Sequence, residues 1–440
     1  MTTQEPGTAR EYVVTGGHVL TMDAALGDLP GGDVHVRDGV IVAVGNDLEA
    51  PGAERIDVRG QVVVPGFVDT HWHMWNTLWR GLSHDAVGYF GLHRLARAFT
   101  PEDHHVAVRH AATEAINAGF TTVHDWANGL SGPADTEAEL AALAETGIRG
   151  RLGHGDGPPG QGHALTAEEL GAAVARADEL GEGRLSVGAV VHHAPGFARS
   201  VAAARELGLR TIAPHADFSP HLDLLGPDVV YTHGAGDPPQ LLGLLGARGV
   251  GIALCPATDP LIGAGMPPLP EMLAAGIALD RIGISVDVTA QSAADPFAAM
   301  RSLLGVNRVA QRPGMSFVDV VAQDMAGGPS TPLMHPREAL AIATVNGARV
   351  LGLDDTAGSL TPGKRADLVT VRTDDLNMLP LHEETDPAAL LVLCGQPSNV
   401  DTVVVDGRVL KRAGRLVGVD VPDLVRRTAA ARTALLARAG

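Results

Sequence analysis

Short apolar runs separated by turn residues mark both ends of the chain. Residues 11–23, 32–45 and 54–66 alternate β-branched and polar positions and are punctuated by glycine and Asp-Gly pairs, which is typical of strands joined by hairpins. The same texture returns in residues 363–374 and 399–420. The last segment, which contains Pro422 near its start, has the pattern of an amphipathic surface helix.

The pattern changes between about residues 65 and 350. Short apolar runs there alternate with Ala- and Leu-rich helical segments, which predicts repeated βα units and a parallel sheet. Eight runs can be counted, and eight strands close a parallel barrel with helices outside. The eight runs are residues 61–69, 121–126, 148–155, 185–193, 209–215, 228–233, 250–256 and 282–288.

Polar residues stand at or near the end of these runs. The C-terminal strand ends of such a barrel form its active-site face. One histidine at a strand end is more often a satisfied core residue, but seven of the eight runs finish with His or Asp, and the remaining run ends at Cys255. The convergence therefore predicts a functional site built from His71 and His73, His124, His154, His193, His215, His233 and Asp287.

His71 and His73 form the sharpest local motif. Residues two apart in an extended segment face the same way, so both imidazoles can reach one ion. Zinc and iron accept neutral imidazole readily. A bare His-x-His pair is common by chance, but this pair closes an apolar strand after Pro65, Gly66 and Asp69, which strengthens the interpretation as a metal motif.

Several motifs extend along nearly the whole chain: PGFVDTHWH, TLWRGL, EAINAGFTTVHD, the strand-end residues and ATVNGARVLGLDDTAGSLTPGKRADLVTV. With these motifs the chain resembles the amidohydrolase superfamily, in the cytosine deaminase-like branch of chlorohydrolases and aminohydrolases that act on nitrogen heterocycles. The resemblance implies an α/β fold, with a distorted (β/α)8 TIM-type barrel over residues 65–350. It also implies a small β-sandwich formed by residues 1–64 and 351–440, with the terminal helix in the second part.

The resemblance also implies roles for individual residues. Asp287 would bind the metal and take the proton from the attacking water, while His233 would bind the metal or position that water. His193 matches a histidine that contacts substrate in relatives, and His154 and Trp126 are further candidates for the substrate pocket. The implied metal ligands are His71, His73, His215, His233 and Asp287.

The scarcity of lysine limits the metal stoichiometry. One large group of these enzymes bridges two metals with a carboxylated lysine on the fourth strand, but the only lysines here are Lys364 and Lys411. The resemblance therefore implies one divalent metal, with zinc preferred and iron open. Such an ion lowers the pKa of bound water from 15.7 toward about 7.

One position departs from the pattern. Deaminating relatives carry a Glu three residues after the fifth-strand histidine, where this chain has Phe218. Asp217 could replace that acid, or it could cap the following helix.

The leading hypothesis is a mononuclear hydrolase that cleaves a C–N bond of a small, cyclic amidine, amide or amino-heterocycle. The alternatives are a dehalogenating hydrolase, a metal-assisted lyase or isomerase, and a non-catalytic ligand-binding relative.

Composition narrows the partners. The formal net charge is -18, from 33 basic and 51 acidic residues, and no basic run is visible, which excludes a nucleic-acid partner. Two cysteines, Cys255 and Cys394, fit a reducing compartment. Neither a secretory signal nor an apolar run long enough for a membrane span is visible, so a cytoplasmic location is expected. A homo-oligomer remains open, with residues 77–82 as a candidate subunit contact.

Overall fold

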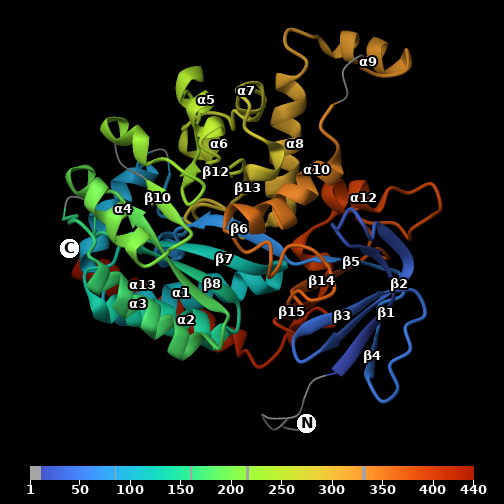
Figure 1. Ribbon diagram of the computed structural model, residues 1–440, viewed down its shortest axis with the longest axis horizontal. Helices are drawn as coiled ribbons and strands as arrows, with labels where there is room; N and C mark the ends of the chain where they lie inside the picture. Colours follow the sequence, from blue (N-terminus) through green and yellow to red (C-terminus); the bar gives the residue numbers. More distant parts are fainter. Residues whose placement is uncertain (1–10, 85, 159–160, 215–217, 330–332) are drawn as a thin grey trace.

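The computed structural model describes residues 11–84, 86–158, 161–214, 218–329 and 333–440. Eight short strands, each ending near a polar residue, form the central barrel (Figure 1). The α/β barrel predicted from the eight apolar runs is confirmed. Its strands are β6 (Phe67–Trp72), β7 (Phe120–Ala127), β8 (Arg149–Gly155), β9 (Leu185–Val191), β10 (Ile212–Pro214), β11 (Val230–Thr232), β12 (Gly251–Leu254) and β13 (Ile282–Ile284).

The barrel closes through two isolated bridges. Strands β10-β9-β8-β7-β6 form one parallel sheet and β11-β12-β13 form another. Parallel bridges join Ile212 to Val229 and Trp72 to Asp287, so one residue pair spans each gap between the two sheets. The second bridge brings together the ends of β6 and β13, which carry His71 and Asp287.

Helices follow most of the strands and cover the outside of the barrel (Figure 1). Helix α1 begins with a capping box between Thr100 and Asp103 and is capped after Ala118 by Gly119, whose φ of 100° suits a residue without a side chain. Strand β7 starts at the next residue, so this cap fixes where the chain enters the barrel. The α-helices are α1 (Pro101–Ala118), α2 (Pro133–Thr146), α3 (Ala167–Gly181), α4 (Phe197–Glu206), α5 (Pro239–Ala247), α6 (Asp259–Ile262), α7 (Leu269–Ala274), α8 (Pro296–Ala310), α9 (Phe317–Met325), α10 (Pro336–Ala341), α11 (Gly347–Val350), α12 (Pro387–Cys394) and α13 (Val421–Arg438).

Both ends of the chain build one nine-stranded sheet beside the barrel (Figure 1). Its order is β17-β16-β15-β14-β5-β1-β2-β3, with β4 paired to β1. A core shared by Val14, Val36, Leu368 and Val404 makes the two ends depend on each other. The strands are β1 (Glu11–Leu20), β2 (Asp28–Arg37), β3 (Val40–Gly45), β4 (Glu54–Asp57), β5 (Gln61–Pro65), β14 (Leu368–Arg372), β15 (Val400–Val405), β16 (Arg408–Arg412) and β17 (Arg415–Leu416).

The first of the eight apolar runs is divided between the two parts of the molecule. Residues 61–65 form β5 and pair with β14, whereas β6 begins at Phe67 and pairs with β7. Gly66 makes the division possible, because a side chain there would meet the Thr121 hydroxyl oxygen at 2.0 Å. The sequence showed one continuous strand here because the close approach of Thr121 leaves no mark on the local apolar pattern.

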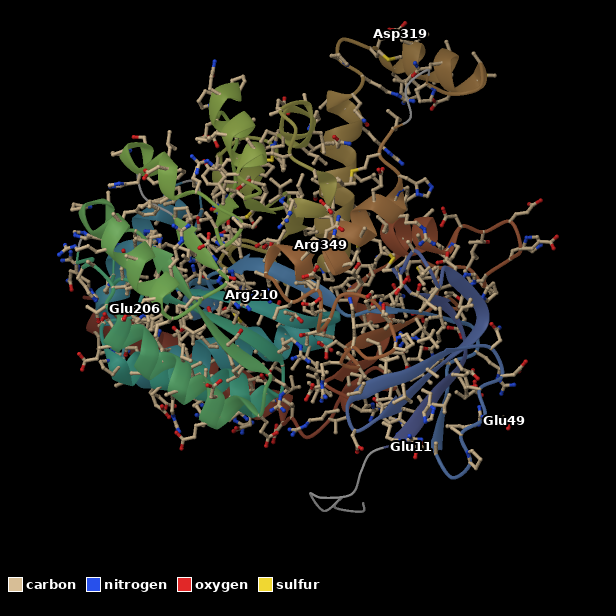
Figure 2. All side chains as sticks on the ribbon, in the orientation of Figure 1. Glu11, Glu49, Glu206, Arg210, Asp319 and Arg349 are labelled. Carbon is tan, nitrogen blue, oxygen red and sulfur yellow. The ribbon has the colours of Figure 1, made fainter. Side chains whose placement is uncertain are left out.

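Two helices lie at the margins of the structure. The predicted terminal helix is α13, which packs on α1 and pairs Arg427 with Glu102 and Arg438 with Asp103. Helix α9 stands apart from the main body, as the position of Asp319 in Figure 2 shows. Among the described residues, none of the helices combines the length and apolar character needed to cross a bilayer.

Candidate metal centre

Four potential metal ligands meet inside the barrel, one from the first barrel strand and three from the segments that follow later barrel strands. His71 lies in β6, while His233, Cys255 and Asp287 follow β11, β12 and β13. One donor atom from each lies within 4.8 Å of the other three. Imidazole, thiolate and carboxylate are all ligands of zinc, and imidazole and carboxylate also suit iron. The chemistry and spacing of this set therefore fit a single divalent ion.

Backbone hydrogen bonds fix His71 and Asp287 relative to each other. The amide of Asp287 donates to the carbonyl of His71 over 3.0 Å, and the amide of His73 donates to the carbonyl of Asp287 over 2.8 Å. His71 Nε2 consequently lies 3.1 Å from Asp287 Oδ1. Asp69 supports the same junction, because its carboxylate accepts hydrogen bonds from the amides of His71 and Val286.

The tautomer of His73 follows from its partner. Asn128 Oδ1 lies 2.7 Å from His73 Nδ1 and accepts a hydrogen bond from Trp75 Nε1 over 2.8 Å. Since an indole N–H can only donate, the shared atom must be the amide oxygen, and His73 Nδ1 must carry a proton. The lone pair of neutral His73 is therefore on Nε2, which lies 3.7 Å from Asp287 Oδ1 and is available to a metal.

His233 is held by a second buried partner. Its Nδ1 lies 2.7 Å from Oδ1 of Asp259, which is fully buried at the start of α6. A carboxylate oxygen accepts, so the Nδ1 proton of His233 points to Asp259 and Nε2 is directed elsewhere. Burial lowers the pKa of His233, but the bond to Asp259 and the charge of Asp287 raise it, and the net change is upward.

Burial also sets the proton affinity of the central carboxylate. Desolvation raises the pKa of Asp287 to about 7, an effect that His233 opposes and the charge of Asp259 reinforces. His233 and Asp287 also have φ values of 65° and 63°, a left-handed conformation that is uncommon outside glycine. Such strained positions often coincide with functional sites.

The candidate centre opens into a cavity of about 660 Å³. His73, His233 and Asp287 contribute to its wall, together with aromatic rings of Tyr89 and Phe218. Phe218 packs against Phe197 and Tyr231, so an aromatic ring stands where the resemblance leads one to expect an acid. The remaining lining residues are Phe90, His93, Asn128, His192, Pro214, Tyr231, Thr232, Gly234, Ala235, Asp237, Ile262 and Ala264.

The other residues proposed from the sequence lie in different surroundings. Trp126 is fully buried, with its ring centroid 3.9 Å from that of His71, so it packs behind the ligands. His154 contributes to a separate cavity of about 360 Å³ between α2 and α3 and approaches the Thr136 hydroxyl at 3.2 Å. His193 donates its amide proton to Asp156, and a side chain at Gly162 would meet its Cβ.

Two proposed residues cannot be placed. His215 and Asp217 lie outside the described residues, which resume at Phe218. The ligand role of His215 and the proton-transfer role of Asp217 therefore stay predictions.

Several site residues were not singled out from the sequence. His192 lines the cavity, whereas His193 was chosen from the pair; burial and the neighbouring His73 and His93 lower the pKa of His192 to about 3. The sequence assigns no role to Cys255, which ends the seventh apolar run, and the structure brings its side chain among the candidate metal donors. Its place after the seventh barrel strand was the available signal. Asn128 follows β7 directly, and this position could have marked it in the same way.

Comparison with known proteins places the chain in a family. Residues 62–410 match the amidohydrolase family. A 5-methylthioadenosine/S-adenosylhomocysteine deaminase of Desulforudis audaxviator is 30% identical over 425 residues, which cover 90% of this chain and 93% of the relative. An 8-oxoguanine deaminase of Pseudomonas aeruginosa is 28% identical over 463 residues, which cover 93% of this chain and 96% of the relative.

Solved structures show the same fold. A zinc-bound adenosine deaminase from Xanthomonas campestris superposes with a TM-score of 0.77 at 21% identity, covering 97% of this chain and 99% of the other. A variant of atrazine chlorohydrolase from Arthrobacter aurescens, complexed with zinc and atraton, gives 0.77 at 23% identity, with coverages of 96% and 100%. The resemblance inferred from the sequence motifs is confirmed, and the chain belongs to the amidohydrolase family.

Proposed function

We propose that this protein is a mononuclear metal-dependent hydrolase that uses water to cleave a C–N bond of a small nitrogen heterocycle. The observation that carries the proposal is the set of His71, His233, Cys255 and Asp287, whose donor atoms lie within 4.8 Å beside a substrate-sized cavity. The deaminase relatives support the same class of reaction.

Each residue of the site has a proposed role in binding the metal, transferring a proton or positioning a ligand. His71, His73, His233 and Asp287 would hold the ion, with Cys255 as a further candidate donor, and the predicted His215 would complete the set. When bound, the ion supplies a nucleophile at neutral pH by lowering the pKa of water toward about 7. Asp287 takes the proton that the attacking water loses, and the predicted Asp217 gives a proton to the departing nitrogen. Asn128 and Asp259 fix the imidazoles of His73 and His233 so that Nε2 of each remains available.

A halide or another good leaving group is the second candidate for displacement. Phe218 lies at the cavity wall with 8% of its surface exposed and supplies no proton. A leaving group that departs without protonation suits this wall better than ammonia does. If the predicted Asp217 supplies the proton instead, deamination remains the main reaction, and the Asp217→Asn variant separates the two because only deamination would fall.

The first test is the metal content of the purified protein, measured by elemental analysis beside a His71→Ala, His73→Ala double variant. We expect about one zinc or iron per chain in the wild type, because the donors surround one position, and a loss of metal in the double variant. The loaded enzyme is then screened with aminopurines, aminopyrimidines, amino-triazines and chloro-triazines. A wild-type protein that takes up no metal on reconstitution would refute the proposal.

A further inference from the structure

The walls of the candidate active site are unusually poor in positive charge. Carboxylates of Asp237 and Asp287 line the cavity, and no lysine or arginine contributes to its lining among the described residues. Of its histidines, His93 has a pKa that burial lowers, and His73 and His233 are proposed to hold the metal. Apart from the metal and its ligands, the described lining therefore offers no permanent cation to an anionic substituent.

A second cavity of about 830 Å³ adjoins the first and continues the same character. The two share Ala235, Asp237 and Ala264, so a ligand at the metal centre can extend past Asp237 into the neighbouring groove. The groove lies among α5, α7 and α8, which Figure 1 shows grouped on the side of β12 and β13. Its lining in the described part of the chain has one charged group besides Asp237, the carboxylate of Glu271.

Exposed apolar side chains form much of this groove. Val309 is 75% exposed and Met266 is 59% exposed, while the half-buried Val306 and the buried Leu242 complete the apolar lining. Burying large exposed apolar side chains beside a substrate cavity under an apolar group of a ligand would contribute favourable binding free energy. The continuity of the groove with the active-site cavity identifies that group as an extension of the substrate itself.

The arginine that lines a cavity neighbouring the active site is already paired. Arg80 lines a separate cavity that shares Tyr89 and Ile262 with the first. Its guanidinium contacts Glu114 at 2.6 Å and donates to the carbonyl of Thr289. A guanidinium held in this way has little remaining attraction for a substrate anion. The net charge of -18 acts against anions as well.

We propose that the substrate is a planar nitrogen heterocycle with an apolar extension and no negative charge, and that Asp237 is the residue that selects against anions. The inference rests on the proposed function, since it names the substrate class of the same site. Asp237 is held in place by Tyr231, whose hydroxyl donates to Oδ2 over 2.6 Å, so its charge has a fixed position at the junction of the two cavities.

Binding of product-like ligands to the metal-loaded protein tests the proposal without turnover. Hypoxanthine and uracil, the rings left after deamination, are each substituted at a ring nitrogen with butyl, 4-aminobutyl or 3-carboxypropyl chains, and affinities are measured by calorimetry. We expect the carboxylate to bind at least about tenfold more weakly than the butyl chain. Lengthening butyl to octyl should improve binding about tenfold or more, because the added methylenes reach the Val309 groove.

Two variants test whether Asp237 causes the weaker binding of the carboxylate ligand. Asp237→Asn keeps an oxygen for the Tyr231 hydroxyl but removes the charge, so it should narrow the gap between the carboxylate and butyl ligands about fivefold. Asp223→Asn, an exposed carboxylate outside both cavity linings, should leave the gap unchanged. Carboxylate binding equal to or tighter than butyl binding would overturn the proposal, and so would failure of every neutral and cationic ligand to bind.

Different results would overturn the proposed hydrolase activity and the proposed selection against anions. Turnover of an anionic heterocycle in the substrate screen would support the hydrolase activity and overturn the selection against anions. Binding in the expected order without hydrolysis of any heterocycle would support the selection against anions and overturn the hydrolase activity.

Discussion

Asn128 offers a direct test of how the metal site is organised. It is 3% exposed, and its single amide oxygen accepts hydrogen bonds from both His73 Nδ1 and Trp75 Nε1. In Asn128→Leu a side chain of similar size replaces that oxygen, so two buried N–H groups lose their acceptor. Each such loss costs about 1–3 kcal/mol, and we expect the free energy of unfolding of the apo-protein to fall by about 2–6 kcal/mol.

The loss of metal affinity in Asn128→Leu tests the His73 tautomer more directly than the loss of stability does. Without the acceptor, His73 is free to place its proton on Nε2 and turn its lone pair away from the site. Removal of such an outer partner weakens metal binding about 10–100-fold, which corresponds to about 1.4–2.7 kcal/mol. Competition with a zinc chelator measures the affinity, and denaturant unfolding measures the stability of the same preparations.

Two further variants make the test decisive. Asn128→Asp retains an oxygen that can accept both hydrogen bonds, so its zinc affinity should stay within about threefold of the wild type. Asn46→Leu, at an exposed asparagine that donates to the Pro30 carbonyl, should change neither quantity. Wild-type zinc affinity in folded Asn128→Leu would refute the reasoning about the His73 tautomer.

Three further predictions concern other parts of the molecule. Asp367→Ala should lower the free energy of unfolding by about 3–5 kcal/mol in denaturant titrations, because it leaves the buried Arg149 guanidinium without its bidentate partner. Burial lowers the pKa of Lys411 from 10.5 to about 8, so between these pH values the unfolded chain binds more protons than the folded protein. The free energy of unfolding should therefore rise with pH across that window by up to about 3 kcal/mol, and Lys411→Met should abolish this rise. Asp259→Leu should weaken zinc binding about 10–100-fold by releasing His233 Nδ1, whereas Asp259→Asn should largely preserve it.

Much of the architecture is encoded locally and could be predicted from the sequence. The barrel strands appear as short apolar runs because a strand buried on both faces needs apolar residues at nearly every position. The Asp38–Gly39 and Asp406–Gly407 pairs mark hairpins because both residues take positive φ there. His71 and Asp287 could be selected because strand ends of a barrel converge on one face.

The place of Asn128 after a barrel strand could have marked it, but the supporting contacts themselves could not be predicted from the sequence. Asn128, Asp259 and Asp237 act through contacts with side chains on other segments or through their place in a cavity wall, and their own neighbourhoods in sequence carry no periodicity that indicates this. The division of one apolar run at Gly66 has the same origin, since it depends on Thr121 from another strand. Local pattern predicts elements and strand ends, whereas tautomers, charge selection and close approaches depend on the assembled barrel.

The backbone at the two central donors shows what this arrangement costs the fold. His233 and Asp287 both take left-handed conformations, each less favourable by about 1–2 kcal/mol for a residue with a side chain. Backbone bonds offset the cost, since the amide of His233 donates to the Ala253 carbonyl and Asp287 bonds to both His71 and His73. The turn out of each strand directs a donor inward that a regular strand would aim elsewhere. The chain therefore accepts local strain at the two positions where proton transfer and metal binding are proposed to meet, a balance expected where function competes with stability.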